Sequence, residues 1–98
     1  MTSVEEGCCH ANSVIILDAR DNVGVAVVPL VANGIYSAIG SGLKVLARDS
    51  IDFGHKLALR DITKGGPIIK YGETIAYARA DIVAGSHVHT HNMLNTIG

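Results

Sequence analysis

Three of the five histidines in this chain of 98 residues lie close together, in the segment GSHVHTHN. His87, His89 and His91 occupy alternate positions, so an extended segment would place all three side chains on one face. The β-branched residues between them favour that extended conformation. A row of imidazoles can bind a divalent metal ion or transfer protons at neutral pH, whereas the simpler alternative is a solvated strand face. No carboxylate lies inside the segment, so further metal ligands would have to come from elsewhere in the fold or from another chain.

Two other short segments place polar side chains directly beside turn glycines. The segment GHK carries the imidazole of His55 and the ammonium group of Lys56. The segment KYG carries the ammonium group of Lys70 and the phenol of Tyr71. Loops that are held by rigid strands commonly carry binding residues. Taken singly, each segment is explained more simply as an ordinary surface lysine or a half-buried tyrosine.

Short apolar segments bounded by Gly, Asp or Asn predict an all-β domain. No window carries a long apolar stripe at helical spacing between good caps, and a short helical turn over 35–39 is only weakly indicated. The predicted strands are Ser13–Asp18, Val23–Val28, Leu43–Ala47, Lys56–Leu59, Pro67–Tyr71, Thr74–Ala78 and His87–His91.

An apolar residue, two spacers and a glycine recur four times along the chain. We interpret each copy as a strand end that buries its apolar side chain, followed by a glycine at which the chain reverses with a φ that other residues resist. The copies are unevenly spaced, so they indicate one small folded β unit rather than a solenoid. They are Val31–Gly34, Ile51–Gly54, Ile62–Gly65 and Ile82–Gly85.

The composition argues against two large classes of binding protein. The formal net charge is −1 with 17% charged residues, which provides no basic patch for nucleic acid. No apolar run is long enough to cross a membrane. The acidic N-terminus also lacks the basic and apolar regions of a secretion signal. We therefore expect neither a nucleic-acid partner nor a membrane partner.

The two cysteines, Cys8 and Cys9, are neighbours and provide no disulfide framework. A reducing, cytoplasmic location is the natural expectation. We assign residues 1–12 to a flexible N-terminal tail and residues 13–98 to the folded domain. A soft-metal site at Cys8, Cys9 and His10 is the alternative for the tail, although two adjacent thiolates do not make a tetrahedral site by themselves.

Four segments together resemble a known enzyme family in their order and spacing. They are DNVGVA, IDFGHKLAL, DITKGGPIIKYGETI and DIVAGSHVHTHN, and the resemblance extends from about Asp18 to Asn92. The chain is similar to the N-terminal region of altronate and galactarate dehydratases, which in some organisms is a separate small subunit. It is also similar to the small subunit of sulfolactate sulfo-lyase. The resemblance implies a SAF-type β-clip domain, which is a compact all-β fold.

The resemblance also implies a lyase reaction. In this family a base removes the proton α to a carboxylate, and a β-hydroxyl leaves as water, or sulfite leaves in the sulfo-lyase. A divalent metal, Fe²⁺ or Mn²⁺, is the implied cofactor. The implied roles are proton transfer for His55 and His89, metal binding for His87, His89 and His91, and substrate binding for Lys56, Lys70, Tyr71 and Asn92. The sequence departs from the family at Ala76, often glycine, and at Ser86, often acidic.

We therefore expect the small subunit of a hydro-lyase, which acts on a small sugar acid and completes the active site of a large catalytic lyase subunit. The chain ends at Gly98, with no room for the large domain of these enzymes, and a domain of this size lacks the walled pocket that elimination chemistry needs. The alternatives are a stand-alone binding or assembly module, or the small subunit of a sulfolactate sulfo-lyase. Edge strands in so small a sheet also leave self-association into a dimer or trimer open.

Overall fold

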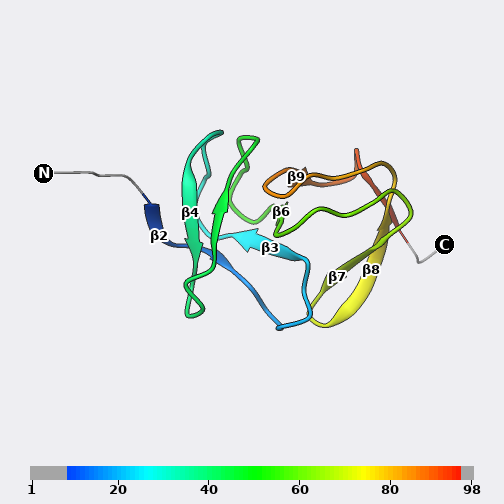
Figure 1. The fold of residues 1–98 in the computed structure, drawn as a ribbon, viewed down its shortest axis with the longest axis horizontal. Helices are drawn as coiled ribbons and strands as arrows, with labels where there is room; N and C mark the ends of the chain where they lie inside the picture. The colour runs from blue at the N-terminus through cyan, green and yellow to red at the C-terminus, as the bar shows by residue number, and fades with distance from the viewer. Residues whose placement is uncertain (1–8, 96–98) are drawn as a thin grey trace, which may run out of the picture.

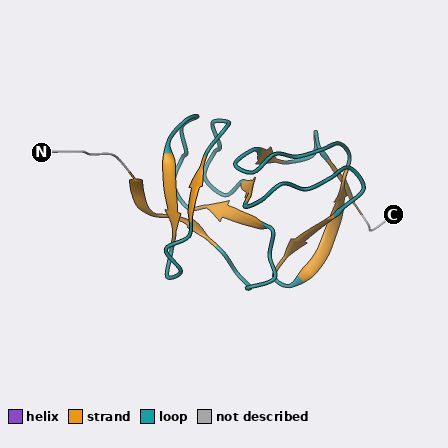
Figure 2. Cartoon of the chain, viewed as in Figure 1, coloured by secondary structure: helices purple, strands orange, loops and turns teal. Residues whose placement is uncertain are grey.

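The computed structural model describes residues 9–95, and these form short strands joined by turns and loops (Figures 1 and 2). The all-β class predicted from the sequence is confirmed. No helix occurs in this range, and so none there could span a membrane. The strands are β2 (Cys9–Ile15), β3 (Val23–Ala26), β4 (Ile35–Ala38), β5 (Lys44–Leu46), β6 (Lys56–Ala58), β7 (Pro67–Lys70), β8 (Glu73–Ala78), β9 (His87–Val88) and β10 (Met93–Asn95).

The strands form two sheets. The larger sheet has the order β5-β4-β2-β3-β6-β9, and the smaller has the order β10-β8-β7. Neighbouring strands are antiparallel except β2 and β4, which run parallel. Figure 1 shows β2 and β4 on one side of the molecule, β7 and β8 on the other, and β3 and β6 between them. The central strands β3 and β6 therefore connect the two sides.

Two clusters of buried apolar side chains make up the hydrophobic core. Strands β3 and β6 contribute to both clusters, because successive side chains of a strand point in opposite directions. The first core contains Val14, Ala26, Leu30, Tyr36, Val45, Ala47, Ile51 and Leu57. The second core contains Val23, Ala58, Ile62, Ile68, Ala76, Ala78, Ile82 and Val88.

The fourfold repeat corresponds to four tight turns, each preceded by a buried residue and followed by a strand. The buried residues pair as two isolated bridges, Leu30 with Ile51 and Ile62 with Ile82. In each turn the N–H of the fourth residue donates to the carbonyl of the first, and the third residue has a positive φ, as in a type II turn. These third residues are Asn33 (φ 75°), Gly54 (85°), Gly65 (83°) and Gly85 (88°).

The register predicted for the first copy of the repeat is wrong by one residue. The buried member is Leu30, which is 2% exposed, whereas Val31 is 65% exposed. Asn33, and not Gly34, takes the positive φ. Asparagine tolerates the left-handed region better than most residues, so this turn does not require glycine.

Three predictions about local conformation also differ from the structure. The predicted helical turn over 35–39 is wrong, because this segment forms β4 between β2 and β5. The predicted strand His87–His91 is too long, since β9 ends at Val88 and a turn follows. Strand β2 begins at Cys9, so residues 9–12 belong to the sheet rather than to a tail. Cys8 lies outside the described residues, and so does the soft-metal alternative that depends on it.

Two adjacent polar residues, Asp21 and Asn22, attach the small sheet to the large one. The carboxamide of Asn22 donates to the carbonyl of Pro67 at 2.8 Å and accepts from the N–H of Ile69 at 2.7 Å. The carboxylate of Asp21 accepts from the N–H of Gly72 at 2.8 Å. Both residues are buried, so these bonds satisfy groups that water does not reach. The pair therefore joins the two sheets through buried hydrogen bonds.

Candidate metal centre

Three histidines converge where β6 and β9 pair. His55 ends the turn that precedes β6, His87 opens β9, and His89 follows the last residue of that strand. The strands are antiparallel, with Leu57 opposite His87, so the start of β6 lies beside the end of β9. This pairing joins residues from the GHK segment and the HVHTHN segment in one cluster, which we call the histidine trio.

The rings of the histidine trio are stacked. Their centroids are 4.7 Å apart for His55 and His89, 5.1 Å for His55 and His87, and 5.4 Å for His87 and His89. Nδ1 of His55 and Nε2 of His87 are 2.9 Å apart, which is a hydrogen-bond distance. In neutral imidazoles one of these two nitrogens must carry the proton and the other must accept it.

The histidine trio has the donor set of a metal site. One ring nitrogen from each histidine lies within 4.8 Å of the others, and all three side chains are partly exposed. Imidazole nitrogen is a suitable ligand for Fe²⁺ and other divalent transition metals. The residues present therefore fit the divalent ion that the sequence resemblance implies, and the partial exposure of all three side chains would leave such an ion accessible from solvent.

His91 lies beside this trio but is not part of it. Its ring is tilted by 40° to that of His87, at a centroid distance of 5.4 Å, and the residue is exposed. The sequence predicts His91 as the third ligand in place of His55. That prediction assumes a strand through residue 91, whereas residues 89–92 form a turn closed by the Asn92 N–H and the His89 carbonyl, 3.0 Å apart.

Two side chains hold the backbone of this segment. The carboxylate of Asp49 accepts from the N–H of His87 at 2.9 Å. The carboxamide of Asn92 donates to the carbonyl of His87 at 2.8 Å and accepts from the N–H of His89 at 2.9 Å. The sequence predicts that Asn92 binds substrate, but its amide group is already engaged with the chain. Asp49 was not anticipated, because nothing in its local sequence distinguishes it from an ordinary loop carboxylate.

Electrostatics favour the uncharged forms of two groups here. Partial burial lowers the pKa of His87, and the neighbouring His55, His91 and His89 add to the effect, while Asp49 opposes it. Burial also lowers the pKa of Lys56, and the positive charge of Lys70 lowers it further. The two predicted substrate-binding lysines thus lie near enough for their charges to interact, and both are half-buried.

Tyr71 lies in a different place from the histidine trio. It is 70% exposed, has a φ of 63°, and occupies the tight turn between β7 and β8. The next residue in this turn, Gly72, packs against Asp18 and Arg20. In Figure 1 the β7–β8 connection is at the bottom of the view, whereas β9 is near the top. The structure therefore does not bring this predicted substrate-binding residue to the histidines.

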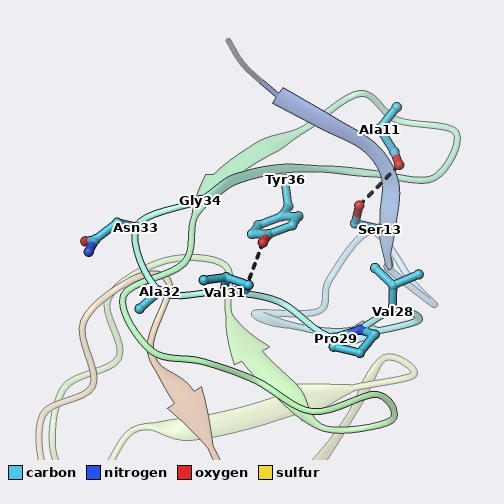
Figure 3. A pocket seen from close by; sticks show the side chains of 9 residues that line it. All are labelled: Ala11, Ser13, Val28, Pro29, Val31, Ala32, Asn33, Gly34 and Tyr36. Carbon is cyan, nitrogen blue, oxygen red and sulfur yellow. Dashed lines mark hydrogen bonds between the residues drawn. The ribbon is translucent and has the colours of Figure 1, made fainter. Parts of the chain in front are cut away.

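A separate pocket of about 670 Å³ lies on the side of β2 and β4 (Figure 3). Tyr36 is the one lining residue with a titratable side chain, and its hydroxyl accepts from the N–H of Val31 at 2.8 Å. The pocket therefore lacks the acids, bases and cations that elimination chemistry needs. Its lining residues are Ala11, Ser13, Val28, Pro29, Val31, Ala32, Asn33, Gly34 and Tyr36.

Comparison with known proteins agrees with the resemblance seen in the sequence. The family described as "Altronate/galactarate dehydratase SAF domain" matches residues 12–96. Altronate dehydratase of Escherichia coli (strain K12) is 49% identical over 78 residues, which is 80% of this chain and 15% of that protein. Altronate dehydratase of Bacillus subtilis (strain 168) is 38% identical over 82% of this chain and 16% of that protein. The chain thus spans about a sixth of the length of these two relatives.

A second kind of relative is similar in extent to this chain. The (2R)-sulfolactate sulfo-lyase subunit alpha of Chromohalobacter salexigens is 37% identical over 84 residues. The match covers 81% of this chain and 89% of that subunit. A domain of this kind therefore occurs both within a long dehydratase and as a named subunit of a lyase.

Proposed function

The chain belongs to the altronate/galactarate dehydratase SAF domain family, and on this premise we propose that it is the small subunit of a hydro-lyase that dehydrates a sugar acid of the altronate or galactarate type. A larger partner subunit would provide the remaining walls of the active site. The observation that carries this proposal is the histidine trio, which lies where the start of β6 pairs with the end of β9.

His55, His87 and His89 are the residues that would hold a divalent ion, with Fe²⁺ or Mn²⁺ as the candidates. When bound, such an ion supplies the positive charge that favours ionisation next to a carboxylate. Three protein ligands also leave positions open for substrate, which is typical of catalytic rather than structural metal sites. The assignment replaces His91 with His55 in the ligand set expected from the sequence.

Neighbouring side chains would bind substrate and transfer protons. Lys56 directly follows His55 and is half-buried, so its ammonium group is a candidate to hold the substrate carboxylate, together with Lys70. His91 is exposed and lies against His87, which leaves its imidazole available as a general acid for the departing hydroxide. The residues of this chain would therefore bind and orient the substrate acid and protonate its departing hydroxyl group.

The need for a partner follows from the openness of the trio and from the relatives. A hydrophobic or walled cavity normally surrounds most of a small substrate, and the partly exposed histidine trio is open to solvent. The altronate dehydratases carry about five sixths of their length outside the matched region. We infer that an equivalent larger chain covers the trio here.

A second candidate is the small subunit of a sulfolactate sulfo-lyase. The observation in its favour is that the match covers 89% of a sulfo-lyase subunit alpha. The higher identity to the Escherichia coli altronate dehydratase favours the first candidate. A stand-alone binding or assembly module of the same fold would bind a metal ion without any lyase partner.

The test is capture of the tagged chain from its native lysate, followed by assay of the recovered complex. We expect a large lyase subunit to be recovered, and the complex to convert altronate or galactarate to an α-keto acid, with no turnover by the small chain alone. Sulfite release from sulfolactate would favour the second candidate. Turnover by the isolated chain would overturn the role as a completing subunit, and recovery without any lyase subunit would favour the binding module.

A further inference from the structure

The short strand β9 exposes one edge of the large sheet, and side chains occupy the polar groups at this edge. Among the strands of residues 9–95, β9 has β6 as its single neighbour. An edge strand normally leaves outward-facing N–H and C=O groups without partners in the sheet. At His87, however, Asp49 accepts the N–H and Asn92 donates to the carbonyl. The N–H and the carbonyl of His87 are therefore both held by side chains, those of Asp49 and Asn92.

Asn92 makes the larger contribution because its carboxamide uses both ends. Its NH₂ group donates to the His87 carbonyl, and its oxygen accepts from the His89 N–H, at 2.8 and 2.9 Å. Its own N–H donates to the His89 carbonyl at 3.0 Å and closes the turn. The side chain of Asn92 thus links the backbones of His87 and His89. It does so where β9 has ended at Val88 and no longer holds the chain.

We infer that Asn92 is a positioning residue, which holds His87 and His89 in register with His55, and that Asp49 assists it at His87. Side chains that orient metal ligands by hydrogen bonds commonly change metal affinity by roughly 10–100-fold when they are removed. Here the bonds act on the backbone rather than on the rings, and the rings follow because each is attached to a fixed Cα atom. The inference rests on the metal-binding role proposed above, but its first test does not.

The first test measures ring positions in the metal-free chain. Nuclear Overhauser effects between ring protons report the stacking of His55 on His89, whose centroids are 4.7 Å apart. We expect Asn92→Ala to abolish these contacts while the amide spectrum of the two cores is retained. Thr90→Ala is the matched control, because Thr90 is an exposed residue of the same turn, and it should keep the contacts. Unchanged ring contacts in Asn92→Ala would overturn the inference.

The second test measures Mn²⁺ affinity by calorimetry in the same three proteins. We expect Asn92→Ala to bind roughly 10–100-fold more weakly than the unmodified chain, and Thr90→Ala to bind equally well. If the unmodified chain binds no metal but Asn92→Ala still loses the ring contacts, the positioning role stands and the proposed metal site fails. If all three proteins bind Mn²⁺ equally, the positioning role fails.

A third variant keeps the inference testable if Asn92→Ala does not fold. Asp49 is exposed, so Asp49→Ala removes the acceptor of the His87 N–H with little effect on either core. We expect it to displace the His87 ring while the contact between His55 and His89 persists. An Asp49→Ala protein with the ring contacts and the Mn²⁺ affinity of the unmodified chain would contradict the bracing of His87.

Discussion

The three stacked imidazoles of the histidine trio are coupled, because the protonation of one ring restricts the protonation of its hydrogen-bonded neighbour. The nitrogens of His55 and His87 share a hydrogen bond, so only one of them can carry the proton between them. A cation bound by both of these nitrogens would replace that proton, because a ligating imidazole nitrogen must be unprotonated. A metal ion bound through these two nitrogens and the histidine–histidine hydrogen bond would therefore exclude each other.

The ligand assignment predicts which histidine variants lose metal binding. His55→Gln should lower Mn²⁺ affinity by more than the roughly 10–100-fold typical of outer-shell changes, because it removes a ligand itself. His91→Gln should leave the affinity nearly unchanged, since His91 lies outside the trio. Calorimetric titration of both variants measures this difference. If Mn²⁺ affinity falls more in His91→Gln than in His55→Gln, the ligands are instead the three histidines predicted from the sequence, His87, His89 and His91.

The lowered pKa of His87 predicts how the metal-free chain responds to acid. The folded chain holds this pKa below the ordinary value of 6.5, so the unfolded chain binds the proton first as the pH falls. The contribution of His87 to stability is therefore complete above pH 6.5 and declines as the pH falls below it. Urea midpoints with chelator present, at about pH 7.5 and about pH 5.5, measure this change. His87→Gln should make the difference between the two urea midpoints smaller. If the difference is as large in this variant as in the unmodified chain, other titrating groups cause it.

At the scale of elements, the four tight turns determine where β4, β6, β7 and β9 begin. Their third residues all have positive φ, but they differ in the space around them. At Gly65 a Cβ atom would meet nothing within 4 Å, whereas at Gly85 it would collide with the carbonyl oxygen of Leu46. The Gly85 turn also accepts a hydrogen bond from the N–H of Arg48 at 2.9 Å. The turn before β9 is therefore packed against the end of β5.

A pair of glycine variants separates backbone strain from this collision. Gly65→Ala should lower the free energy of unfolding by about 1–2 kcal/mol, the cost of a left-handed L-residue. Gly85→Ala should cost more, because the Leu46 backbone must also move. Urea denaturation of both variants gives the two losses. Equal losses in the two variants would mean that the backbone around Leu46 can move aside without lowering the free energy of unfolding.

The strands could be predicted from the sequence where a local pattern specifies them. They could not be predicted where pairing with a distant segment determines the conformation. Turn glycines and β-branched runs indicate most of the strands, and the repeat finds three of the four turns in register. β4 is missed because the apolar residues in 35–39 fit a helical turn as well as a strand. Its pairing with β2 settles the matter, and that contact joins segments more than twenty residues apart, such as Cys9 and Ile35. β9 is shorter than predicted because Asn92 closes a turn that competes with the strand.

On the scale of the whole molecule, Asn22 connects the two sheets. Asn22→Ala leaves the Ile69 N–H and the Pro67 carbonyl without their partner, in a region where Asn22 itself is only 7% exposed. We expect a loss of about 1–3 kcal/mol in the free energy of unfolding. Amide hydrogen exchange should accelerate in β7 and β8 more than in β2 and β4. Uniform acceleration across both sheets would show that the two sides unfold as one unit.

The fold class and the two segments that supply the histidine trio could be anticipated, whereas the set of histidines that converge could not. The GHK and HVHTHN segments supply all three members of the histidine trio, and the resemblance draws attention to both. Which imidazoles converge depends on the register of β6 against β9, and a shift of one residue would present different side chains. Tyr71 is separated from the trio because it lies in the β7–β8 turn, which is held by the hydrogen bond that the Gly72 N–H donates to Asp21.

The order of synthesis gives the β6–β9 pairing a further consequence. The first core consists entirely of residues between 14 and 57, so it can form on a nascent chain that already includes His55. His87 is translated 32 residues later, and the carboxamide that braces it follows five residues after that. A ribosome-bound chain would thus contain His55 before the other two members of the histidine trio have been synthesised. Capture of a metal ion would mark a completed and folded chain, and could not assist its first steps.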